Sequence, residues 1–445
     1  MAIPEGLRVA LNEIRETSIQ DNTLFAKYVT EIMPDTDVGT YAAPILANQA
    51  VANEFMDKLI KRISYTQVMT KTYRSKLKVL EGDRIPLGYA GQELYINPAK
   101  ARRFNVDDFA GLLAKYTADI KAIYPEVNVD VQYPVTITRD KLRNAFVSWG
   151  ALEDFISGIS NSLYNGHYID EYRYTKALVS NAYATNSIQM QTVSAVSNEA
   201  TGKALVKALR EAYLDFMEPT SRNNAWEKVG GYGPAVVTWS MPEDIYLLIR
   251  NDVLAAVDVD VLSASFNMSK AEFLGRVIGV DSFDRYNENN EKVFDGSAII
   301  CGLFDRAWFR IKEQDLALDE FFNANNRCWN LYLNSTKMYA YSCFANGKLF
   351  VTSLPTVKPT KITFNETAPT VEEEATVKLS VVTEPFQAND TITYTSSDST
   401  KATVAADSND NKKCVVTGVA DGTVTITATC GNVTGTVTVT VTNPA

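Results

Sequence analysis

The chain has 445 residues, a formal net charge of -10, and 46% hydrophobic and 22% charged residues. A chain of this length exceeds one ordinary hydrophobic core, so two or three domains are expected, and the composition is that of a folded protein. The acidic balance argues against tight, non-specific nucleic-acid binding, which needs many Lys and Arg side chains against phosphates. It leaves room for a local DNA-facing patch.

The N-terminus carries scattered charges and lacks the continuous apolar run of a signal peptide. No apolar run in the sequence approaches the roughly 18 residues that span a membrane. We therefore expect the protein to stay in the cytoplasm where it is made, without a membrane partner. The five cysteines include no CxxC pair, so neither a zinc site nor a disulfide framework is predicted. Cys414 and Cys430 are placed to meet across strands, but a reducing compartment makes a disulfide unexpected.

Residues 1–64 are predicted to form an arm followed by a helix. Leu7, Leu11 and Ile14 indicate a short amphipathic stretch. Breaks in the chain are then expected at Pro34, Gly39 and Pro44, and a helix over residues 45–63. Because the arm shows little apolar core of its own, we expect it to lie on a neighbouring subunit.

Residues 65–138 are predicted to form a projecting loop. Apolar residues alternate from Val127 to Ile137, which is typical of a half-buried strand, and Pro134 within that strand indicates a sheet edge. A short helix is expected to begin near Asp107. The run KTYRSKLK is usually just a solvated face, but in a projecting loop it could meet an acidic neighbour. Its candidate interface residues are Lys71, Arg74, Lys76 and Lys78.

A long amphipathic helix is predicted from Asp140 to Leu163, with Thr138 or Asp140 as its cap. Asn165-Gly166 is expected to interrupt it before a second helical stretch that reaches about Ala184. The apolar face should pack against strands from residues 298–354. Seven residues at alternating spacings of three and four form that face: Leu142, Ala145, Trp149, Leu152, Ile156, Ile159 and Leu163.

The following segment, up to residue 300, is predicted to be an α/β unit. We expect a helix over residues 205–216, a short buried strand over residues 235–240, and a second helix that starts at Pro242 and carries Ile245, Leu248, Ile249 and Leu254. Aromatic and β-branched residues predict strands over residues 298–312 and 327–354. From Val357 to Ala445, short alternating runs rich in Thr, with Gly at the turns, predict a separate all-β sandwich.

The sequence contains only weak signals for a catalytic or metal site. His167 is the only histidine, so the usual metal-ligand and Ser/His patterns are largely excluded and a packing or surface role is expected. Asp258 and Asp260 could pair as carboxylates, although capping of a following helix is the favoured interpretation. GGYG at 230–233 and Gly202-Lys203 lack phosphate-loop spacing and are interpreted as turn glycines. DSNDN at 407–411 lacks the glycine and glutamate of a calcium loop, so a hairpin turn is expected.

Four motifs carry a family resemblance: IPLG at 85–88, AFVSWG at 145–150, DVDVLSASFNMSKAEFLG at 258–275 and FANGKLFV at 344–351. Together they resemble the major capsid protein of small short-tailed phages of the phi29 type. TSSDSTKATV at 395–404 and VVTGVADGTVTITAT at 415–429 resemble the bacterial immunoglobulin-like domain of the second group. The sequence departs from the family mostly in the loop and in residues 276–296.

The resemblance implies an α+β chain with the tailed-phage capsid fold of the Hong Kong 97 (HK97) type, followed by an all-β immunoglobulin-like sandwich. The implied parts are an N-terminal arm and helix (1–64), an extended loop (65–138), a spine helix with the peripheral domain (139–189), an axial domain (190–300), returning peripheral strands (301–356) and the immunoglobulin-like domain (357–445). The face of the spine helix opposite its apolar stripe would look towards the shell interior.

The function implied by the resemblance is that of a structural major capsid protein, without enzymatic activity or cofactor. Such a protein assembles with itself as hexamers and pentamers into an icosahedral or prolate shell around double-stranded DNA, with a scaffolding protein and a portal protein as partners. It would reside in the virion head after assembly in the host cytoplasm. A head fibre or a host-surface glycan is a candidate ligand of the C-terminal domain. The alternative is a surface adhesin or cell-wall binding protein that uses the same β module.

Overall fold

The computed structural model describes residues 3–65, 73–86, 91–102, 114–231, 233–257, 276–287, 289 and 291–443. The chain divides into two compact units. Unit 1 comprises residues 1–93, 123–175 and 310–340, and unit 2 comprises residues 94–122, 176–309 and 341–445. Among the described helices, none combines the length and apolarity of a membrane span.

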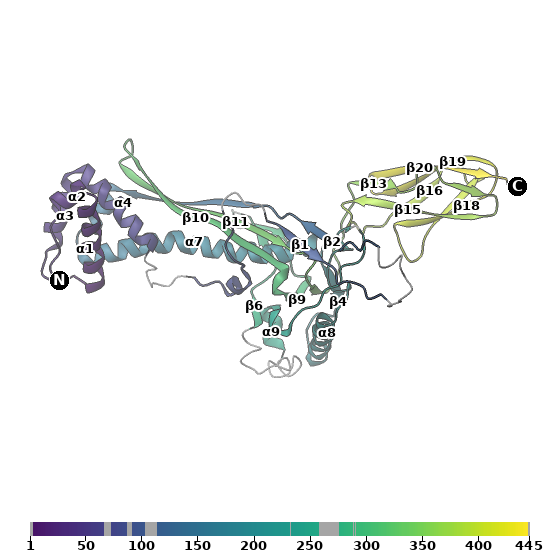
Figure 1. The fold of residues 1–445 in the computed structure, drawn as a ribbon, viewed down its shortest axis with the longest axis horizontal. Coiled ribbons are helices and arrows are strands. Elements are labelled where there is room, and N and C mark those ends of the chain that lie inside the picture. The colour runs from purple at the N-terminus through teal and green to yellow at the C-terminus, as the bar shows by residue number, and fades with distance from the viewer. Residues whose placement is uncertain are drawn as a thin grey trace. The chain divides into compact units, whose positions relative to one another are not determined.

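Unit 1 begins with four helices that pack around one end of the long helix α7 (Figure 1). They are α1 (Glu5–Gln20), α2 (Leu24–Tyr28), α3 (Val38–Ala47) and α4 (Gln49–Tyr65). Leu7, Leu11 and Ile14 are buried on α1 and join the same apolar cluster as Trp149 at the start of α7. The expectation that this arm lacks a core of its own is therefore wrong, because its apolar face is buried within its own unit.

The predicted breaks at Gly39 and Pro44 are also wrong, because both residues lie inside α3. Asp37 caps this helix by accepting hydrogen bonds from the backbone N–H groups of Gly39 and Thr40. The helix expected over residues 45–63 is split at Asn48, whose extended backbone ends α3. The Asn48 side chain then accepts a hydrogen bond from the N–H of Ala50 in the first turn of α4.

The predicted spine is two helices, α6 (Arg139–Ala145) and α7 (Trp149–Ala184). The Thr138 hydroxyl caps α6 by accepting from the Lys141 N–H. Helix α7 has 36 residues, so it is about 54 Å long. The expected interruption at Asn165-Gly166 is wrong. A glycine within a helix costs only about 1 kcal/mol, which neighbouring contacts readily offset, and the Asn165 side chain accepts a hydrogen bond from the Tyr73 N–H.

A three-stranded sheet runs along α7 within unit 1 (Figure 1). Its order is β10 (Phe309–Asn323), β11 (Cys328–Tyr341) and β3 (Val129–Thr138). Strand β3 pairs with β11 in antiparallel register, with Pro134 opposite Tyr332. It lies at the sheet edge, as Pro134 predicted, because a proline cannot donate to a second neighbouring strand.

Six of the seven predicted stripe residues on α6 and α7 are buried, and Ile156 is partly buried. They share one cluster with Trp329, Leu331 and Leu333 of β11 and with the N-terminal helices. The Trp149 ring lies 5.5 Å from that of Tyr41, and its indole N–H donates to the Thr36 carbonyl at 3.1 Å. The helix therefore has strands on one part of its apolar face and helices on another.

Unit 2 contains a five-stranded sheet with helices α8 (Glu199–Met217) and α9 (Asn251–Ala256). Helix α8 buries Leu205, Leu209 and Phe216 in a cluster shared with β5 and β9. In sheet order the strands are β4 (Gln189–Thr192), β12 (Gly347–Val351), β9 (Ile299–Asp305), β5 (Ile245–Arg250) and β6 (Val277–Val280).

Two expectations in this unit are wrong. Residues 245–250 form strand β5 and not a helix, because the run lies in the sheet between β9 and β6 and is buried on both faces. The expected strand over residues 235–240 is reduced to one bridge at Thr238. The Asn97 side chain takes the place of a strand partner there, since it donates to the Ala235 carbonyl and accepts from the Val237 N–H.

The glycines interpreted as turn glycines differ in their surroundings. Gly202 lies inside α8, so its interpretation as a turn glycine is wrong, whereas Gly230 and Gly233 have the positive φ angles of turns.

Some predicted features lie outside the described residues. They are Lys71, Asp258, Asp260, the motif over residues 258–275 and the start of the helix expected near Asp107. The end of that expected helix is instead β2 (Ile120–Ile123), which pairs with β1 (Glu93–Ile96). A second short pair joins β7 (Arg285–Tyr286) and β8 (Lys292–Phe294).

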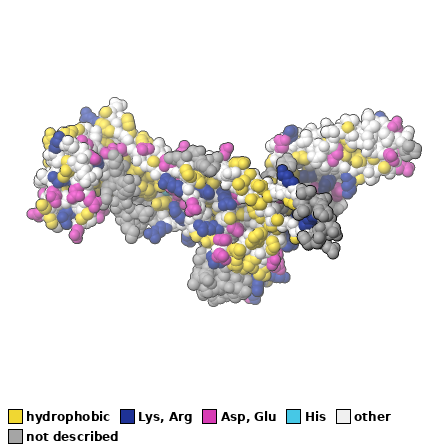
Figure 2. All heavy atoms as spheres, viewed as in Figure 1, with side chains coloured by type: hydrophobic (Ala, Val, Ile, Leu, Met, Phe, Trp, Pro, Cys, Tyr) yellow, Lys and Arg dark blue, Asp and Glu magenta, His cyan; other side chains and the backbone are white. Residues whose placement is uncertain are grey.

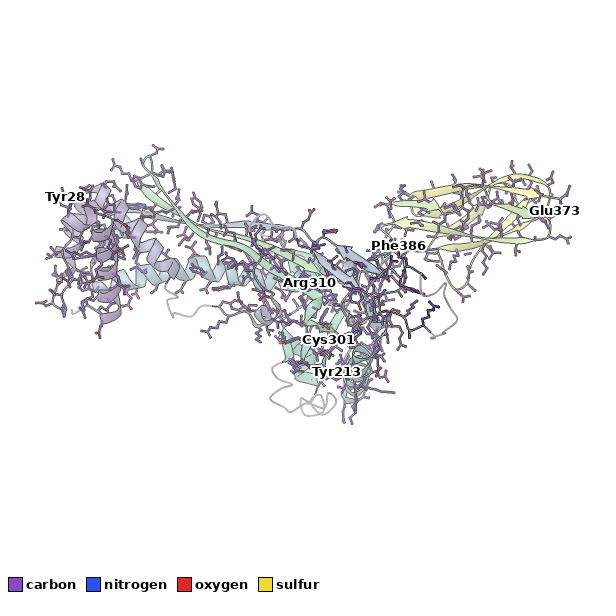
Figure 3. All side chains as sticks on the ribbon, in the orientation of Figure 1. Tyr28, Tyr213, Cys301, Arg310, Glu373 and Phe386 are labelled. Carbon is purple, nitrogen blue, oxygen red and sulfur yellow. The ribbon has the colours of Figure 1, made fainter. Side chains whose placement is uncertain are left out.

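The C-terminal residues form the predicted β sandwich. Its first sheet contains β13 (Lys361–Phe364), β15 (Thr376–Glu384), β18 (Lys413–Gly418) and β17 (Ala402–Ala406), and its second contains β14 (Thr370–Glu372), β20 (Val433–Thr442), β19 (Gly422–Cys430) and β16 (Thr393–Ser396). Glu373 and Phe386 lie towards opposite ends of this sandwich (Figure 3). Residues 407–411 are the hairpin between β17 and β18, as predicted. Cys414 and Cys430 lie in different sheets and are free.

Candidate assembly site at the root of the extended loop

The described part of the predicted basic run, residues 73–78, lies against α7 in unit 1. It overlaps the 3-10 helix η1 (Lys76–Leu80), which buries Leu77 and Leu80. Ser75 caps η1 by accepting a hydrogen bond from the Leu77 N–H at 3.2 Å. We call residues 73–86 the loop root. Of the predicted interface residues on it, Arg74 and Lys76 are exposed, while Lys78 points to charges within the same unit.

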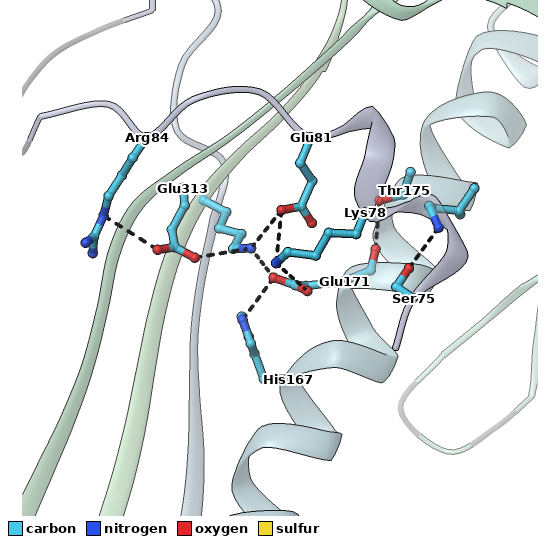
Figure 4. A network of polar contacts seen from close by, with 10 residues as sticks. Ser75, Lys78, Glu81, Arg84, His167, Glu171, Thr175 and Glu313 are labelled. Atoms are coloured by element: carbon cyan, nitrogen blue, oxygen red, sulfur yellow. Dashed lines mark hydrogen bonds and ion pairs between the residues drawn. The ribbon is translucent and has the colours of Figure 1, made fainter. Parts of the chain in front are cut away.

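Four side chains of alternating charge close a ring at the loop root (Figure 4). Lys78 lies 3.3 Å from Glu81 and 3.8 Å from Glu171, measured from Nζ to carboxylate oxygen. Lys337 Nζ lies 3.9 Å from the same Glu81 and forms a close ion pair with Glu171. Two members come from the loop root, one from α7 and one from β11. We call Lys78, Glu81, Glu171 and Lys337 the charge ring.

The body half of the charge ring is buried, and its root half is more exposed. The side chains of Glu171 and Lys337 are each 2% exposed, whereas that of Lys78 is 56% exposed. A buried charge without a partner is very unfavourable, so Lys337 and Glu171 depend on each other. Additional charges surround them. Glu313 of β10 lies 3.5 Å from Lys337, and Arg84 lies 3.5 Å from Glu313.

His167 lies in this network and is buried. Its Nε2 lies 3.0 Å from Glu171 Oε1, and its ring contacts that of Tyr133 edge-on. His167, Glu171 and Glu313 offer ligand atoms within 4.8 Å of one another, a spacing that a metal ion could use. The Lys337 ammonium already contacts both carboxylates, so this arrangement is a buried ion-pair cluster. His167 therefore has a packing and hydrogen-bonding role here.

The electrostatics of the ring favour its charged state. Burial alone would raise the pKa of Glu171, but the hydrogen bond with His167 and the charge of Lys337 outweigh it and lower that pKa to about 2. Burial lowers the pKa of Lys78, but the charges of Glu171 and Glu81 more than offset this, and the pKa stays above its ordinary value. Glu171 and Lys78 are thus both charged at neutral pH.

Further contacts hold described segments of the predicted loop. The backbone N–H groups of Gly82 and Ile85 donate to the carbonyls of Ile311 and Glu313 on β10. Within unit 1, Arg310 donates to Glu93 at the start of β1 at 2.6 Å, and Figure 3 marks Arg310 on β10. Within unit 2, Lys121 of β2 is buried, pairs with Asp119 at 3.2 Å and lies 5.3 Å from the Trp226 ring.

Sequence reasoning did not single out Glu81, Glu171 or Lys337. A signal existed for Lys337, because it continues the inward-facing alternation of Leu331, Leu333 and Ser335 along β11. A lysine at a core position of a strand implies a buried carboxylate partner. The sequence contains no pattern that names this partner, since Glu171 is 166 residues away. Among the other described polar groups, burial raises the pKa of the Cys301 thiol, which lies with Tyr213 in the core of unit 2 (Figure 3).

Comparisons with known proteins agree with this structure. Residues 11–351 match the family model of the Phi29-like phage major capsid protein, and residues 358–441 match that of the bacterial Ig-like domain of group 2. The chain is 30% identical over 329 residues to the major capsid protein of Bacillus phage PZA, covering 74% of this chain and 69% of that protein. It is 29% identical over 346 residues to the major capsid protein of Bacillus phage B103, covering 77% and 72%.

The fold is also similar to that of a solved phage capsid structure. A chain in the capsid structure of Staphylococcus phage Andhra aligns with a TM-score of 0.53 at 15% identity, covering 65% of this chain and 87% of that chain. The long helix α7, the β10–β11 hairpin and the five-stranded unit are thus the parts of a tailed-phage capsid fold of the HK97 type. The family match covers most of the sequence up to residue 351. The chain belongs to the Phi29-like phage major capsid protein family and carries a bacterial Ig-like domain of group 2 after the capsid fold.

Proposed function

We propose that copies of this chain associate as hexamers and pentamers into an icosahedral or prolate head shell that encloses double-stranded DNA. The observation that carries the proposal is the outward face of β1 and β2. Leu94, Ile96 and Ile120 on these strands are 55%, 58% and 57% exposed. Exposed apolar side chains gathered on one small sheet mark an interaction surface. A neighbouring copy is the expected occupant, because a shell of identical subunits repeats one interface many times.

Electron microscopy of the purified protein, co-expressed with its scaffolding partner, tests this proposal. We expect closed shells from the unsubstituted chain and few or none from Leu94→Ser/Ile96→Ser. Val419→Ser is the matched control, since Val419 is 47% exposed on the C-terminal sandwich and should leave shells intact. A stable monomer of the unsubstituted chain in the presence of the scaffolding protein would contradict the proposal.

The further partners follow from the same family role. We infer a scaffolding protein and a portal protein as assembly partners, and packaged DNA held by weak contacts. The net charge of -10 supports weak DNA contact, and Lys and Arg side chains are interspersed with Asp and Glu on the face seen in Figure 2. Assembly would take place in the host cytoplasm and yield the virion head. We infer a purely structural role, without catalysis or cofactor, which is supported by the engagement of the only histidine with Glu171.

The domain assignment is part of the proposal. We assign the N-terminal arm and helix to residues 1–64, the extended loop to 65–138, the spine to 139–189, the axial domain to 190–300 and the returning peripheral strands to 301–356. The C-terminal domain would span 357–445. We retain Lys71, Arg74, Lys76 and Lys78 as candidates for contact with an acidic neighbour. The exposure of Arg74 and Lys76 supports this.

A second role concerns the C-terminal domain, for which we infer binding of a head fibre or a host-surface glycan. Register places threonines opposite each other on β19 and β20: Thr425 pairs with Thr438, and Thr427 with Thr436. These side chains point outward, opposite to the buried Val and Ile residues, and most of the domain surface in Figure 2 is neither charged nor apolar. A glycan pull-down with isolated residues 357–445 tests this role, and binding would also revive the adhesin alternative.

A further inference from the structure

We propose that the charge ring fixes the orientation of the loop root on the body of unit 1, and that neighbouring subunits assemble only when the root holds this orientation. The inference rests on the proposed shell function and deepens it. Its residues are Lys78 and Glu81 on the loop root and Glu171 and Lys337 on the body of unit 1. No residue of the ring is assigned a role by the family comparison.

The ring connects root to body twice, with opposite polarity. Lys78 of the root faces the carboxylate Glu171, and Glu81 of the root faces the ammonium of Lys337, at 3.8 and 3.9 Å. A single ion pair can be kept while a segment swings around it. Two ion pairs of opposite sign, formed by root residues three positions apart, allow only one orientation of η1. If the helix were reversed or shifted along α7, like charges would face each other.

The other contacts of the loop root either have no preferred direction or lie outside η1. Leu77 and Leu80 are buried, which holds η1 on the surface, but apolar contact is non-directional. The Lys78 ammonium also lies 5.7 Å from the Tyr168 ring on α7. The hydrogen bonds from Gly82 and Ile85 to β10 lie beyond η1 on its C-terminal side, and the hydrogen bond from the Tyr73 N–H to Asn165 of α7 lies before it on the N-terminal side. Within η1 and its C-terminal cap Glu81, the charge ring therefore provides the contacts that fix the rotation of the helix against α7 and β11.

Glu171 and Lys337 are the two members of the charge ring whose side-chain positions are fixed by other contacts. Each is 2% exposed, and His167 and Glu313 contact them from two further positions on α7 and β10. Their side chains cannot rotate to follow a displaced root without losing these partners. The side chains of the two root residues have more freedom to move, since that of Lys78 is 56% exposed and that of Glu81 is 15% exposed.

The decisive variant exchanges the two root charges, Lys78→Glu/Glu81→Lys. It keeps net charge, composition and the root's internal ion pair, but it places a carboxylate opposite Glu171 and an ammonium opposite Lys337. Lys78→Arg/Glu81→Asp keeps the signs and should rescue. The matched control is Glu199→Lys/Lys203→Glu, which exchanges an exposed pair within α8 at 2.6 Å.

Three measurements are made on each variant: thermal unfolding of the soluble subunit, hydrogen exchange of the backbone amides of residues 76–85 in that unassembled subunit, and shell yield with the scaffolding protein. For the charge-swapped variant we expect the hydrogen-exchange rate of these amides to rise by about tenfold, since two attractive pairs between the root and the body become repulsive. Unfolding should stay within a few degrees of the unsubstituted chain, and shell yield should fall severalfold. The conservative variant and the α8 control should match the unsubstituted chain in all three.

Unchanged exchange in the root exchange variant would overturn the ring as the determinant of root orientation. Faster exchange with a full yield of regular shells would overturn its role in assembly. Failure of the unsubstituted chain to form shells would instead refute the proposed function, and with it the assembly part of this inference. Hydrogen exchange is read on the soluble subunit, so the two failures are distinguishable.

Discussion

The body of unit 1 and the C-terminal sandwich treat charge in opposite ways. The first buries Lys337, Glu171 and His167 together in one network. In the sandwich, no described charged residue between 361 and 443 is buried, and pairs such as Lys378 with Asp407 lie at its surface. Buried ion pairs contribute specificity more than stability. The capsid fold thus joins separate segments through paired buried charges, whereas the sandwich is a self-contained module held by apolar alternation.

The largest expected effect comes from Lys337→Met, which leaves Glu171 as a buried carboxylate without the buried ammonium that pairs with it. Breaking a buried pair in this way costs about 3–5 kcal/mol of unfolding free energy. Urea denaturation should show this loss, and Lys378→Met on the sandwich should change stability by about 1 kcal/mol or less. Equal effects of the two substitutions would remove the contrast between the regions.

Trp149→Ala tests the apolar side of the same unit. The ring is 3% exposed and contacts Tyr41, so its removal should cost about 3–5 kcal/mol. Val147→Ala is the neighbouring control, since Val147 is 74% exposed and should be nearly neutral. Normal soluble yield, shell assembly and denaturation midpoint of the Trp149 variant would show that this stripe is not essential to the core.

Acid provides a third test of the buried network. The pKa of Glu171 is lowered from 4.5 to about 2, so its charged form stabilises the folded state at pH values above about 4.5. This contribution, about 3 kcal/mol, should be lost as the pH falls from about 4.5 towards 2. Denaturation of the unsubstituted chain should show this loss, whereas Glu171→Gln should remove this part of the pH dependence. Parallel pH profiles for the two proteins would contradict the assignment.

Removal of residues 357–445 should have the smallest effect on the rest of the chain. The sandwich has its own core, with Leu379, Val416 and Val439 among its buried residues, so the remaining chain should unfold within a few degrees of its midpoint in the full-length protein. The isolated domain should unfold cooperatively on its own. Aggregation of the truncated chain under native conditions would show that the two parts depend on each other.

Much of the fold could be predicted where a strict pattern acts over short range. The alternation up to Ile137 and the threonine alternation of the sandwich predicted strands correctly, because side chains of a strand point to opposite faces at a period of two. The same reasoning failed at residues 245–250, since an unbroken apolar run suits a buried strand as well as a helix. It also failed at Asn165-Gly166, where contacts from Tyr73 support α7 through residues that would otherwise favour a break.

The sequence by itself determined the strands of the sandwich, the edge position of β3 through Pro134 and the family, because each depends on local residue pattern or on motifs in order. Only the tertiary structure decided the burial of the N-terminal arm in its own unit and the composition of the charge ring. Lys78, Glu81, Glu171 and Lys337 come from three distant parts of the chain. Their pairing follows from the three-dimensional packing of η1, α7 and β11, and charge acts through space and not along the sequence.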